Sequence, residues 1–371
     1  MSSVHARPVL IMAGGTGGHV FPALALARLL RARSYEVIWL GTHKGLEARV
    51  VPADRIQIEF LSVGGLRGKG FTTLLAAPFR LALALSQALR VMWRHRPLVV
   101  VGLGGFVTGP GGVAAWLTRR PLLIHEQNAV AGFTNRCLSH LAREVLEAFP
   151  GSFGSSVQAR PIGNPVRQDI SAIAPPAARF ADRSGAIRIL VIGGSQGATR
   201  LNAVVPQALA RLKQLAPPQI PAIDVRHQAG ERWIEAGRSS YANAGVRADV
   251  RPFIEDMAEA YSWADLVICR SGALTVSELA AAGVGAILVP FPAAVDDHQT
   301  HNAQYLVKEG AAVLIADRDL TAERLTEELQ RLCAGRAKLL AMAERARQLA
   351  MPQAAEELAR SCIAMASKEA A

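Results

Sequence analysis

The sequence predicts an α/β protein built from two doubly wound, Rossmann-like domains, and three observations support this fold class. Strand-like apolar runs such as PVLIMA, EVIWLG and PLVVVGLG alternate with helical patterns in the first half, as in the βαβ units of a parallel sheet. A polar stretch rich in proline and alanine (169–185) then interrupts the alternation. After it the alternation restarts, and its opening LVIGGSQGA is similar to the first opening, LIMAGGTGG.

The interruption predicts a domain boundary, with a first domain over 1–167 and a second over 168–349. Helical patterns of the first domain lie at 20–33, 72–94, 113–117 and 133–141. Later strand-like runs of the second domain are DVRHQAG, ADVRPFI, ADLVICRSG and GAILVPFP. No strand follows the last helix, at about 350–371, and we expect it to pack back onto the first domain. Ligands of such sheets bind beyond the carboxyl ends of the strands, so we expect a site in a central cleft that both domains face.

The composition argues against several other classes of protein. The four cysteines are far apart and form no CxxC pair, which fits a reducing cytoplasm better than a disulfide framework or a zinc knuckle. The amino-terminal residues lead into a strand without the apolar core of a signal peptide. The longest charge-free run (97–118) is interrupted by glycines and a proline, so we expect no membrane-spanning helix.

The net charge of +11 is concentrated in the first half of the chain. Residues 1–167 hold nineteen Lys or Arg and seven Asp or Glu, and the segment 60–125 holds eight basic residues and no acid. Such a segment is a solvated basic face, or it binds an anionic membrane surface or nucleic acid. We expect no nucleic-acid binding, because the segment lacks interleaved aromatic residues and a recognised module.

Three glycine-rich turns follow strands: AGGTGGH, GLGGFVTGPGG and IGGSQGA. Glycine lets a backbone approach a ligand closely, and helix N-termini favour anions, so the turns indicate phosphate or sugar-phosphate binding, with tight turns alone as the alternative. No P-loop string GxxxxGK[ST] occurs. The first turn lacks the third glycine of a dinucleotide site, and the second strand ends in LGTHKG without an acid that could hold a ribose.

Polar residues of the second half suggest nucleotide chemistry. Glu278 lies in the first turns of a predicted helix, where its carboxylate could accept both hydroxyls of a ribose or complement the helix dipole. The segment DDHQTHNA (296–303) could supply metal ligands, but its spacing does not match a typical metal site. We expect Gln299 of this segment to contact a sugar or ribose instead.

In the first half, HEQNAVAGFTNR places His125, Glu126, Gln127 and Asn128 at the carboxyl end of a strand. Active sites of doubly wound sheets lie at this edge. Strand-end polar residues also cap helices, and that structural alternative remains open.

Nine strings in this order resemble the bacterial MurG family, the N-acetylglucosaminyltransferases of peptidoglycan synthesis, over roughly residues 7–350. These strings are GGTGGHVFPALALA, GGFVTGPGG, HEQNAVAGFTNR, GNPVR, GGSQGA, HQAG, PFIEDM, RSGALTVSE and DDHQTHNA. One departure is Ala131, where the family pattern has proline.

The resemblance implies the two-domain GT-B architecture and an inverting transferase. It would move N-acetylglucosamine from UDP-N-acetylglucosamine to the 4-hydroxyl of the muramyl sugar of lipid I, giving lipid II and UDP. The resemblance implies no cofactor and no metal. It implies a peripheral protein on the cytoplasmic face of the bacterial inner membrane, because lipid I is anchored there, and this gives the acid-free segment 60–125 an anionic surface to bind.

Site residues carried over by the resemblance fall in both domains. The second domain would bind the donor, and residues of the first would approach its sugar and phosphates. In the first domain these are Thr16, Gly17, Gly18 and Asn128; around the second they are Arg167, Ser195, Ile254, Ala273, Leu274, Thr275, Val276, Ser277, Glu278 and Gln299.

Glycosyl transfer needs a base for the acceptor hydroxyl, stabilisation of the leaving group and exclusion of water. We expect His19, at the tip of the first glycine loop, to be the base, with Glu126 as the alternative; a histidine that only caps its helix is the structural alternative. Other readings of the chain are a related GT-B transferase with another lipid acceptor, a UDP-sugar epimerase and a non-catalytic nucleotide-sugar binding protein.

Overall fold

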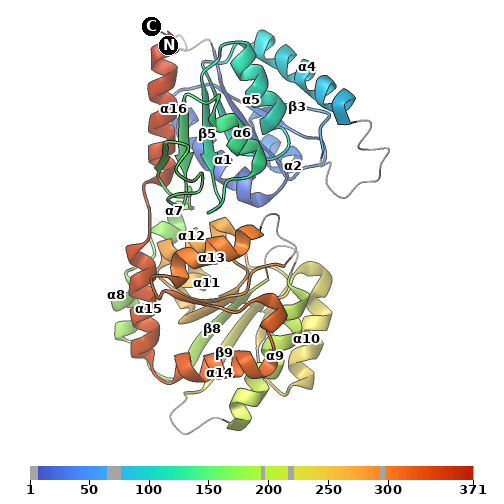
Figure 1. The fold of residues 1–371 in the computed structure, drawn as a ribbon. Helices are drawn as coiled ribbons and strands as arrows, with labels where there is room; N and C mark the ends of the chain where they lie inside the picture. Colours follow the sequence, from blue (N-terminus) through green and yellow to red (C-terminus); the bar gives the residue numbers. More distant parts are fainter. Residues whose placement is uncertain (1–6, 65–76, 194–196, 216–220, 293–296, 371) are drawn as a thin grey trace. The chain divides into compact units, whose positions relative to one another are not determined.

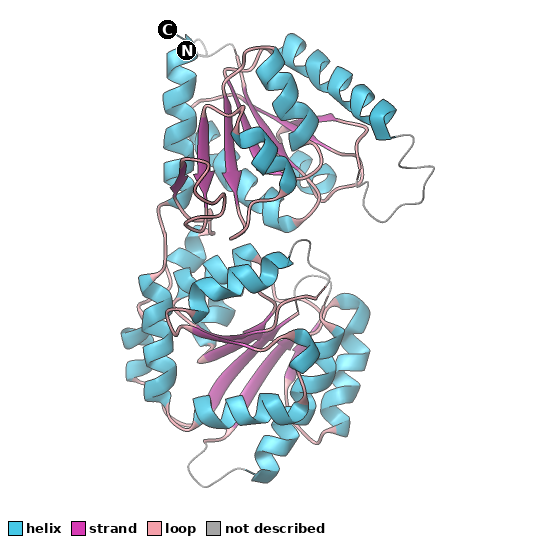
Figure 2. Cartoon of the chain, in the orientation of Figure 1, coloured by secondary structure: helices cyan, strands magenta, loops and turns pink. Residues whose placement is uncertain are grey.

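The computed structural model describes residues 7–64, 77–193, 197–215, 221–292 and 297–370 (Figure 1). The chain divides into two compact units, each with a sheet between helices (Figure 2). The first unit contains residues 1–166 and 352–371, and the second contains residues 167–351. Two parallel-sheet α/β units are what the alternating pattern predicts, so this part of the predicted fold class is confirmed.

The first unit is built on a parallel sheet of order β3-β2-β1-β4-β5-β6-β7 among the described strands. Strands β1, β2, β4 and β5 are buried along their whole length, which explains their continuous apolar sequences. The strands are β1 (Val9–Ala13), β2 (Val37–Gly41), β3 (Gln57–Phe60), β4 (Val99–Gly104), β5 (Leu122–Glu126), β6 (Glu144–Glu147) and β7 (Ala159–Pro161).

Helices cover both faces of this sheet. One core cluster joins the sheet to α1, α2 and α16, and another joins it to α4, α5 and α6. The carboxyl-terminal helix α16 packs on α1 and buries Leu358, Cys362 and Met365 in the first cluster (Figure 1). The helices are α1 (Gly17–Ala32), α2 (Glu47–Ala53), α4 (Ala77–His95), α5 (Thr108–Leu117), α6 (Phe133–Ser139) and α16 (Ala354–Ala370).

Two helices of the first unit begin earlier than the sequence pattern predicts. Helix α1 begins at Gly17, because Thr16 takes an extended backbone and the N–H groups of His19 and Val20 bond to its carbonyl at 3.2 Å. His19 therefore lies in the first turn of a helix, and the expectation that it lies at a loop tip is wrong. The N–H groups of Gly17 and Gly18, which come before these bonds, have no partner within the helix.

Helix α5 begins at Thr108, so the predicted turn GLGGFVTGPGG is in fact a short turn followed by a helix. Pro110 fits there, because the first turn of a helix needs no N–H from it. A Cβ on Gly111 would lie 2.2 Å from Sδ of Met12, and one on Gly112 would lie 2.7 Å from Leu138. These two glycines thus let α5 pack closely, and they do not form the turn.

The second unit has a parallel sheet of order β10-β9-β8-β11-β12-β13 among the described strands. Its main core cluster joins the sheet to α8, α9, α10, α14 and α15, and α12 packs against α13 and α15. The strands are β8 (Ile187–Ile192), β9 (Ile223–Gln228), β10 (Asp249–Arg251), β11 (Leu266–Cys269), β12 (Gly285–Leu288) and β13 (Ala312–Leu314). The helices are α7 (Gln168–Ser171), α8 (Pro176–Ala181), α9 (Thr199–Leu215), α10 (Ile234–Asn243), α11 (Met257–Trp263), α12 (Ala273–Ala282), α13 (His298–Val307), α14 (Ala322–Cys333) and α15 (Arg336–Gln348), with 3₁₀ turns η1 (Glu231–Trp233) and η3 (Asp317–Asp319).

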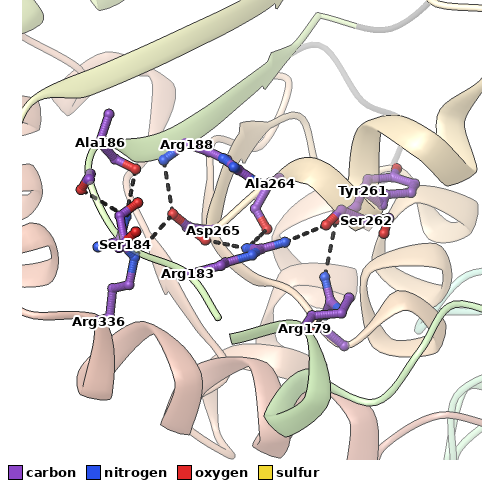
Figure 3. Close-up of polar contacts among 12 residues, drawn as sticks. Arg179, Arg183, Ser184, Ala186, Arg188, Tyr261, Ser262, Ala264, Asp265 and Arg336 are labelled. Carbon is purple, nitrogen blue, oxygen red and sulfur yellow. Dashed lines mark hydrogen bonds and ion pairs between the residues drawn. The ribbon is translucent and has the colours of Figure 1, made fainter. Parts of the chain in front are cut away.

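A fully buried carboxylate, Asp265, organises the start of this sheet (Figure 3). It pairs with Arg183 and accepts the backbone N–H of Arg188 at 3.0 Å. Arg183 also donates to the carbonyls of Ser262 and Ala264. Because a buried charge is tolerated only when it is paired and hydrogen-bonded, this cluster fixes the segment before β8 against the end of α11.

No helix within the described part of the chain is both long and apolar enough to cross a bilayer. Helix α4 is nonetheless unusual, because it carries large apolar side chains that face solvent. Phe79 is 80% exposed and Trp93 is 66% exposed. Arg80 and Arg90 are also exposed on this helix.

Candidate active site

At the carboxyl edge of the first sheet, the loop before α1 is held by a buried acid, Glu47. The carboxylate of Glu47 accepts the N–H of Gly15 at 2.9 Å, and from Thr42 it accepts the N–H at 2.9 Å and the hydroxyl at 2.7 Å. A Cβ on Gly14 would lie 2.7 Å from Glu47 Oε1. The glycine loop is therefore fixed in place by a residue that lies outside it.

His19 is the first member of a row of polar side chains that runs along the same edge. Its Nδ1 lies 2.7 Å from Oε1 of Gln127, and Nε2 of Gln127 lies 3.0 Å from Nδ1 of His125. Nε2 of His125 lies 2.9 Å from the carbonyl oxygen of Gly163. His125 and Gln127 are almost completely buried, whereas His19 is only partly buried. The exposed end of the row is thus an imidazole.

The turn after β4 packs directly on the His19 ring. Gly104 and Gly105 have φ angles of +110° and +89°, in the region that favours glycine. A Cβ on Gly104 would lie 2.6 Å from Nδ1 of His19, and one on Gly105 would lie 2.4 Å from the carbonyl oxygen of Gly14. This close approach is the structural reason for glycine at both positions.

Glu126 lies beside this row, but its carboxylate is fully occupied by its own loop. Oε1 accepts the backbone N–H and the side-chain amide of Asn128 at 2.9 and 3.1 Å. Oε2 accepts the N–H of Gly132 at 3.1 Å and the amide of Asn135 at 2.9 Å. With 2% of its surface exposed, Glu126 shapes the loop between β5 and α6.

The departure at Ala131 has a clear structural consequence in this loop. Ala131 is fully buried, and its backbone N–H donates to the carbonyl of Ser152 at 2.8 Å. The hydroxyl of Ser152 donates in turn to the carbonyl of Asn128 at 2.8 Å. Proline has no N–H to donate, so a proline at this position could not form the hydrogen bond to Ser152.

In the second unit, Glu278 lies on α12, whose N-terminus is at the carboxyl end of β11. The hydroxyl of Tyr261 donates to Oε2 of Glu278 at 3.0 Å. Burial raises the pKa of Glu278 to about 7, although the Tyr261 hydrogen bond and the positive charge of Arg167 act in the opposite direction. The half-exposed Arg167 therefore belongs to the surroundings of this carboxylate.

Two further side chains brace the loops at this edge. Oε1 of Gln299 accepts the N–H groups of Ser271 at 3.2 Å and Phe291 at 2.9 Å, which ties the loop after β11 to the loop after β12. Oε1 of Gln228 accepts the N–H of Ile254 at 2.9 Å. The side-chain oxygens of both glutamines accept hydrogen bonds from backbone N–H groups. The amide nitrogen of Gln299 has no partner among the described residues.

Comparison with known proteins assigns the chain to a family. The model of the glycosyltransferase family 28 N-terminal domain matches residues 9–147, and that of the C-terminal domain matches residues 188–358. A Marinobacter nauticus protein is 56% identical over 93% of this chain and 94% of its own length. A Nitrosococcus oceani protein is 56% identical over 97% and 99%. Both are named UDP-N-acetylglucosamine--N-acetylmuramyl-(pentapeptide) pyrophosphoryl-undecaprenol N-acetylglucosamine transferase. The chain belongs to this MurG family of glycosyltransferases.

Solved structures agree with the assignment. The crystal structure of Acinetobacter baumannii MurG is 42% identical and matches 96% of this chain and 99% of its own, with a TM-score of 0.85. The calicheamicin glycosyltransferase CalG4 matches 98% of this chain and 99% of its own with a TM-score of 0.67 at 18% identity. This second likeness shows a shared fold only.

The structure places the predicted MurG-family site residues at the carboxyl edges of the two sheets. Thr16 immediately precedes α1, and Gly17, Gly18 and His19 begin it. Glu126 ends β5, and Asn128 follows this strand. In the second unit, Arg167 and Glu278 lie near each other, Ile254 follows β10, and Gln299 lies in the first turn of α13. The α12 residues Ala273, Leu274, Thr275, Val276 and Ser277 precede Glu278 on the same helix. Ser195 lies outside the described residues.

Several predicted site residues have side chains that are buried or hydrogen-bonded to neighbouring protein groups. Val276 is fully buried, so only its backbone could meet a ligand. The Ser277 hydroxyl donates to the carbonyl of Ala273 at 3.0 Å. The amide of Asn128 donates to Glu126. These side chains stabilise the edge on which a ligand would rest.

Reasoning from sequence missed three residues that hold the site together. Glu47 lies beyond the strand end LGTHKG, and only the fold brings it to Gly15. Gln127 links His19 to His125, a role that its position at the end of a strand does not indicate. Tyr261 is on α11, far from Glu278 in sequence, and no pattern indicates this pairing.

Proposed function

We propose that this chain transfers N-acetylglucosamine from UDP-N-acetylglucosamine to the muramyl sugar of lipid I, giving lipid II and UDP with inversion at the anomeric carbon. Family membership at 56% identity over nearly the whole chain carries the proposal, because the relatives bear the name of this reaction. We infer that the two units supply what the reaction needs: the carboxylate of Glu278 and the N-terminus of α12 in the second, and the partly exposed imidazole of His19 in the first.

The second unit would bind the donor. Ionised Glu278 would accept the two ribose hydroxyls, a bidentate arrangement that one hydroxyl could not reproduce. The N-terminus of α12 and the guanidinium of Arg167 would stabilise the negative charge on the leaving UDP. We include Ser195, Ile254 and Gln299 in this donor site. Such groups can stabilise a pyrophosphate without a divalent cation.

The first unit would supply the base, and we assign that role to His19. A base must present a lone pair to the acceptor hydroxyl. His19 is partly exposed and its Nδ1 is directed at Gln127, so Nε2 is the nitrogen that can meet substrate. Glu126 is the poorer candidate, because four donors from its own loop and from α6 already surround its carboxylate.

The other functions are less well supported by these observations. A UDP-sugar epimerase acts without an acceptor, and a binding protein releases no UDP. The relatives of more than half identity carry a transferase name, and none of the described contacts favours proton abstraction from a donor sugar.

Release of UDP tests the proposed reaction. The purified chain is incubated with UDP-N-acetylglucosamine in EDTA, with and without a soluble lipid I analogue. We expect UDP release that requires the acceptor and is unaffected by EDTA. A changed sugar nucleotide without acceptor would support the epimerase, and binding without UDP release would contradict transfer.

The pKa of Glu278 predicts how UDP binding depends on pH. With a pKa of about 7, the ionised fraction rises about tenfold between pH 6 and pH 8. If ionised Glu278 holds the ribose, UDP affinity should rise over this range by up to about tenfold. Calorimetric titrations of the protein with UDP at pH 6, 7 and 8 measure this change in affinity.

The substitution Glu278→Gln is the matched control, because titration of UDP itself is the same for both proteins. We expect the variant to bind UDP more weakly at pH 8 and to lose the part of the pH dependence that Glu278 causes. For 2′-deoxy-UDP, which lacks one of the two ribose hydroxyls, the substitution should cause a smaller loss of affinity than for UDP. Identical pH profiles for the two proteins would contradict the role of Glu278.

We also propose that the first unit binds the anionic membrane surface through the basic segment 60–125, so that the protein acts peripherally at the cytoplasmic face of the inner membrane. The exposed Phe79, Leu83 and Trp93 of α4 are suited to insertion among lipid headgroups, and Arg80 and Arg90 are suited to anionic lipid. Residues 65–76 of this segment lie outside the described residues.

Vesicle binding tests this surface. Each basic residue near anionic lipid contributes on the order of 1 kcal/mol, so the double variant Arg80→Gln/Arg90→Gln should bind anionic vesicles about tenfold or more weakly. Binding should also fall as salt is raised. Arg238→Gln, an exposed substitution on α10 of the second unit, is the control and should bind normally. Equal binding of the unsubstituted protein to neutral and anionic vesicles would contradict the electrostatic contribution.

A further inference from the structure

We propose that Gln127 and His125 are positioning residues that fix His19 in the tautomer with its hydrogen on Nδ1, so that Nε2 carries the lone pair. The inference deepens the proposed function, because it rests on His19 as the base of the transfer. It concerns two residues that would touch neither donor nor acceptor. It follows from the hydrogen-bonding capacities of the four groups in the row.

One end of the row is the carbonyl of Gly163, which can act only as a hydrogen-bond acceptor. The nitrogen 2.9 Å from it, Nε2 of His125, must therefore carry a hydrogen. Burial lowers the pKa of His125 to about 4, against the smaller opposing effects of that carbonyl and of Glu126. The ring is therefore neutral at pH 7, has a single hydrogen, and presents a lone pair on Nδ1.

The side-chain amide of Gln127 then has only one suitable orientation. Its nitrogen lies 3.0 Å from Nδ1 of His125 and 3.0 Å from the carbonyl oxygen of His125, and both of these atoms are acceptors. Rotating the amide by half a turn would place its oxygen against two acceptors. The carbonyl of Gln127 is itself held by the amide of Asn164 at 3.0 Å, so the backbone at this residue is also fixed.

With the amide nitrogen on His125, the amide oxygen faces His19. That oxygen lies 2.7 Å from Nδ1 of His19, and an oxygen acceptor requires a hydrogen on that nitrogen. A neutral His19 therefore has its lone pair on Nε2, the form that a general base needs. The carbonyl of Gly163 thus determines the tautomer of His125, which determines the orientation of the Gln127 amide. That orientation in turn determines the tautomer of His19.

An amide in this place has a specific consequence for catalysis. When Nε2 takes the proton of the acceptor hydroxyl, the Nδ1–H···O bond becomes charge-assisted and stronger. A neutral amide gives this support without adding a second negative charge to a site that must hold a pyrophosphate. The turn at Gly104 limits movement of the ring from the other side, so both the orientation and the tautomer are fixed.

The tautomers can be read directly in the unsubstituted protein. In protein labelled with ¹⁵N-histidine, long-range ¹H–¹⁵N spectra at pH 8 distinguish protonated from unprotonated ring nitrogens. We expect hydrogen on Nδ1 of His19 and on Nε2 of His125, with His19→Ala and His125→Phe used for assignment. Hydrogen on Nε2 of His19, or a mixture of its two tautomers, would overturn the proposal. This result does not depend on the identity of the sugar acceptor, so it is separable from failure of the proposed function.

A matched pair of substitutions at Gln127 tests the effect on catalysis. Gln127→Met keeps the length of the side chain and removes the acceptor. Gln127→Glu keeps an acceptor oxygen for Nδ1 of His19, and its other oxygen can bond to Nδ1 of His125 once one of these two atoms takes up a proton. In transfer to the lipid I analogue, we expect Gln127→Met to lower kcat by about 10- to 100-fold, part of the roughly 10²–10⁴-fold contribution of a general base. KM for the acceptor and affinity for UDP should remain unchanged.

Gln127→Glu should retain more of kcat than Gln127→Met, and the Met variant should show the Nε2–H tautomer of His19. The resonances of His227, which is in a separate network with Asn202 and Tyr241, serve as an internal control for folding and should not move. A kcat of Gln127→Met within about twofold of the unsubstituted protein would overturn the positioning role. A rise in KM for the acceptor together with the fall in kcat would show that Gln127 only supports packing. This result would also overturn the positioning role.

Discussion

The site in the first unit depends on one constraint: each polar side chain buried at the carboxyl edge of its sheet needs at least one hydrogen-bond partner. An unpaired polar group in such a place costs about 1–3 kcal/mol. Glu47 therefore takes the donors of the glycine loop, and Glu126 takes those of the loop after β5. Gln127 takes one partner on each side. Once these groups are paired, the imidazole of His19 is the member of the row that is left partly exposed for chemistry.

The same division between bracing and reacting groups occurs in the second unit. Gln228 and Gln299 use their oxygens to hold backbone N–H groups of neighbouring loops. Glu278 differs from them, because its single described hydrogen bond comes from Tyr261 and its burial keeps its pKa near 7. A carboxylate with spare lone pairs is suited to the hydroxyls of a ribose, and the N-terminus of the same helix is suited to the charge of a pyrophosphate.

Much of this architecture could be predicted from the sequence. Alternating apolar runs predict the two parallel sheets, and GGTGGH and HEQN indicate which strand ends carry polar residues. The short strands β7 and β13 could not be predicted, since three residues give little periodic signal and β7 is mostly exposed. The early start of α5 was missed because glycines that permit close packing resemble glycines that form turns. The hydrogen bond between Gly15 and Glu47 could not be predicted, since it depends on a tertiary contact that no sequence motif indicates.

The most direct test of this account is the rate of sugar transfer by His19→Ala, measured with UDP-N-acetylglucosamine and a soluble lipid I analogue. Removal of a general base lowers turnover by about 10²–10⁴-fold, and the account predicts a loss in this range. Affinity for UDP should be unchanged, because the UDP contacts that we propose for Glu278, Arg167 and the N-terminus of α12 belong to the second unit. Turnover within a few-fold of the unsubstituted protein would show that another group takes the proton, and would contradict the central role given to His19.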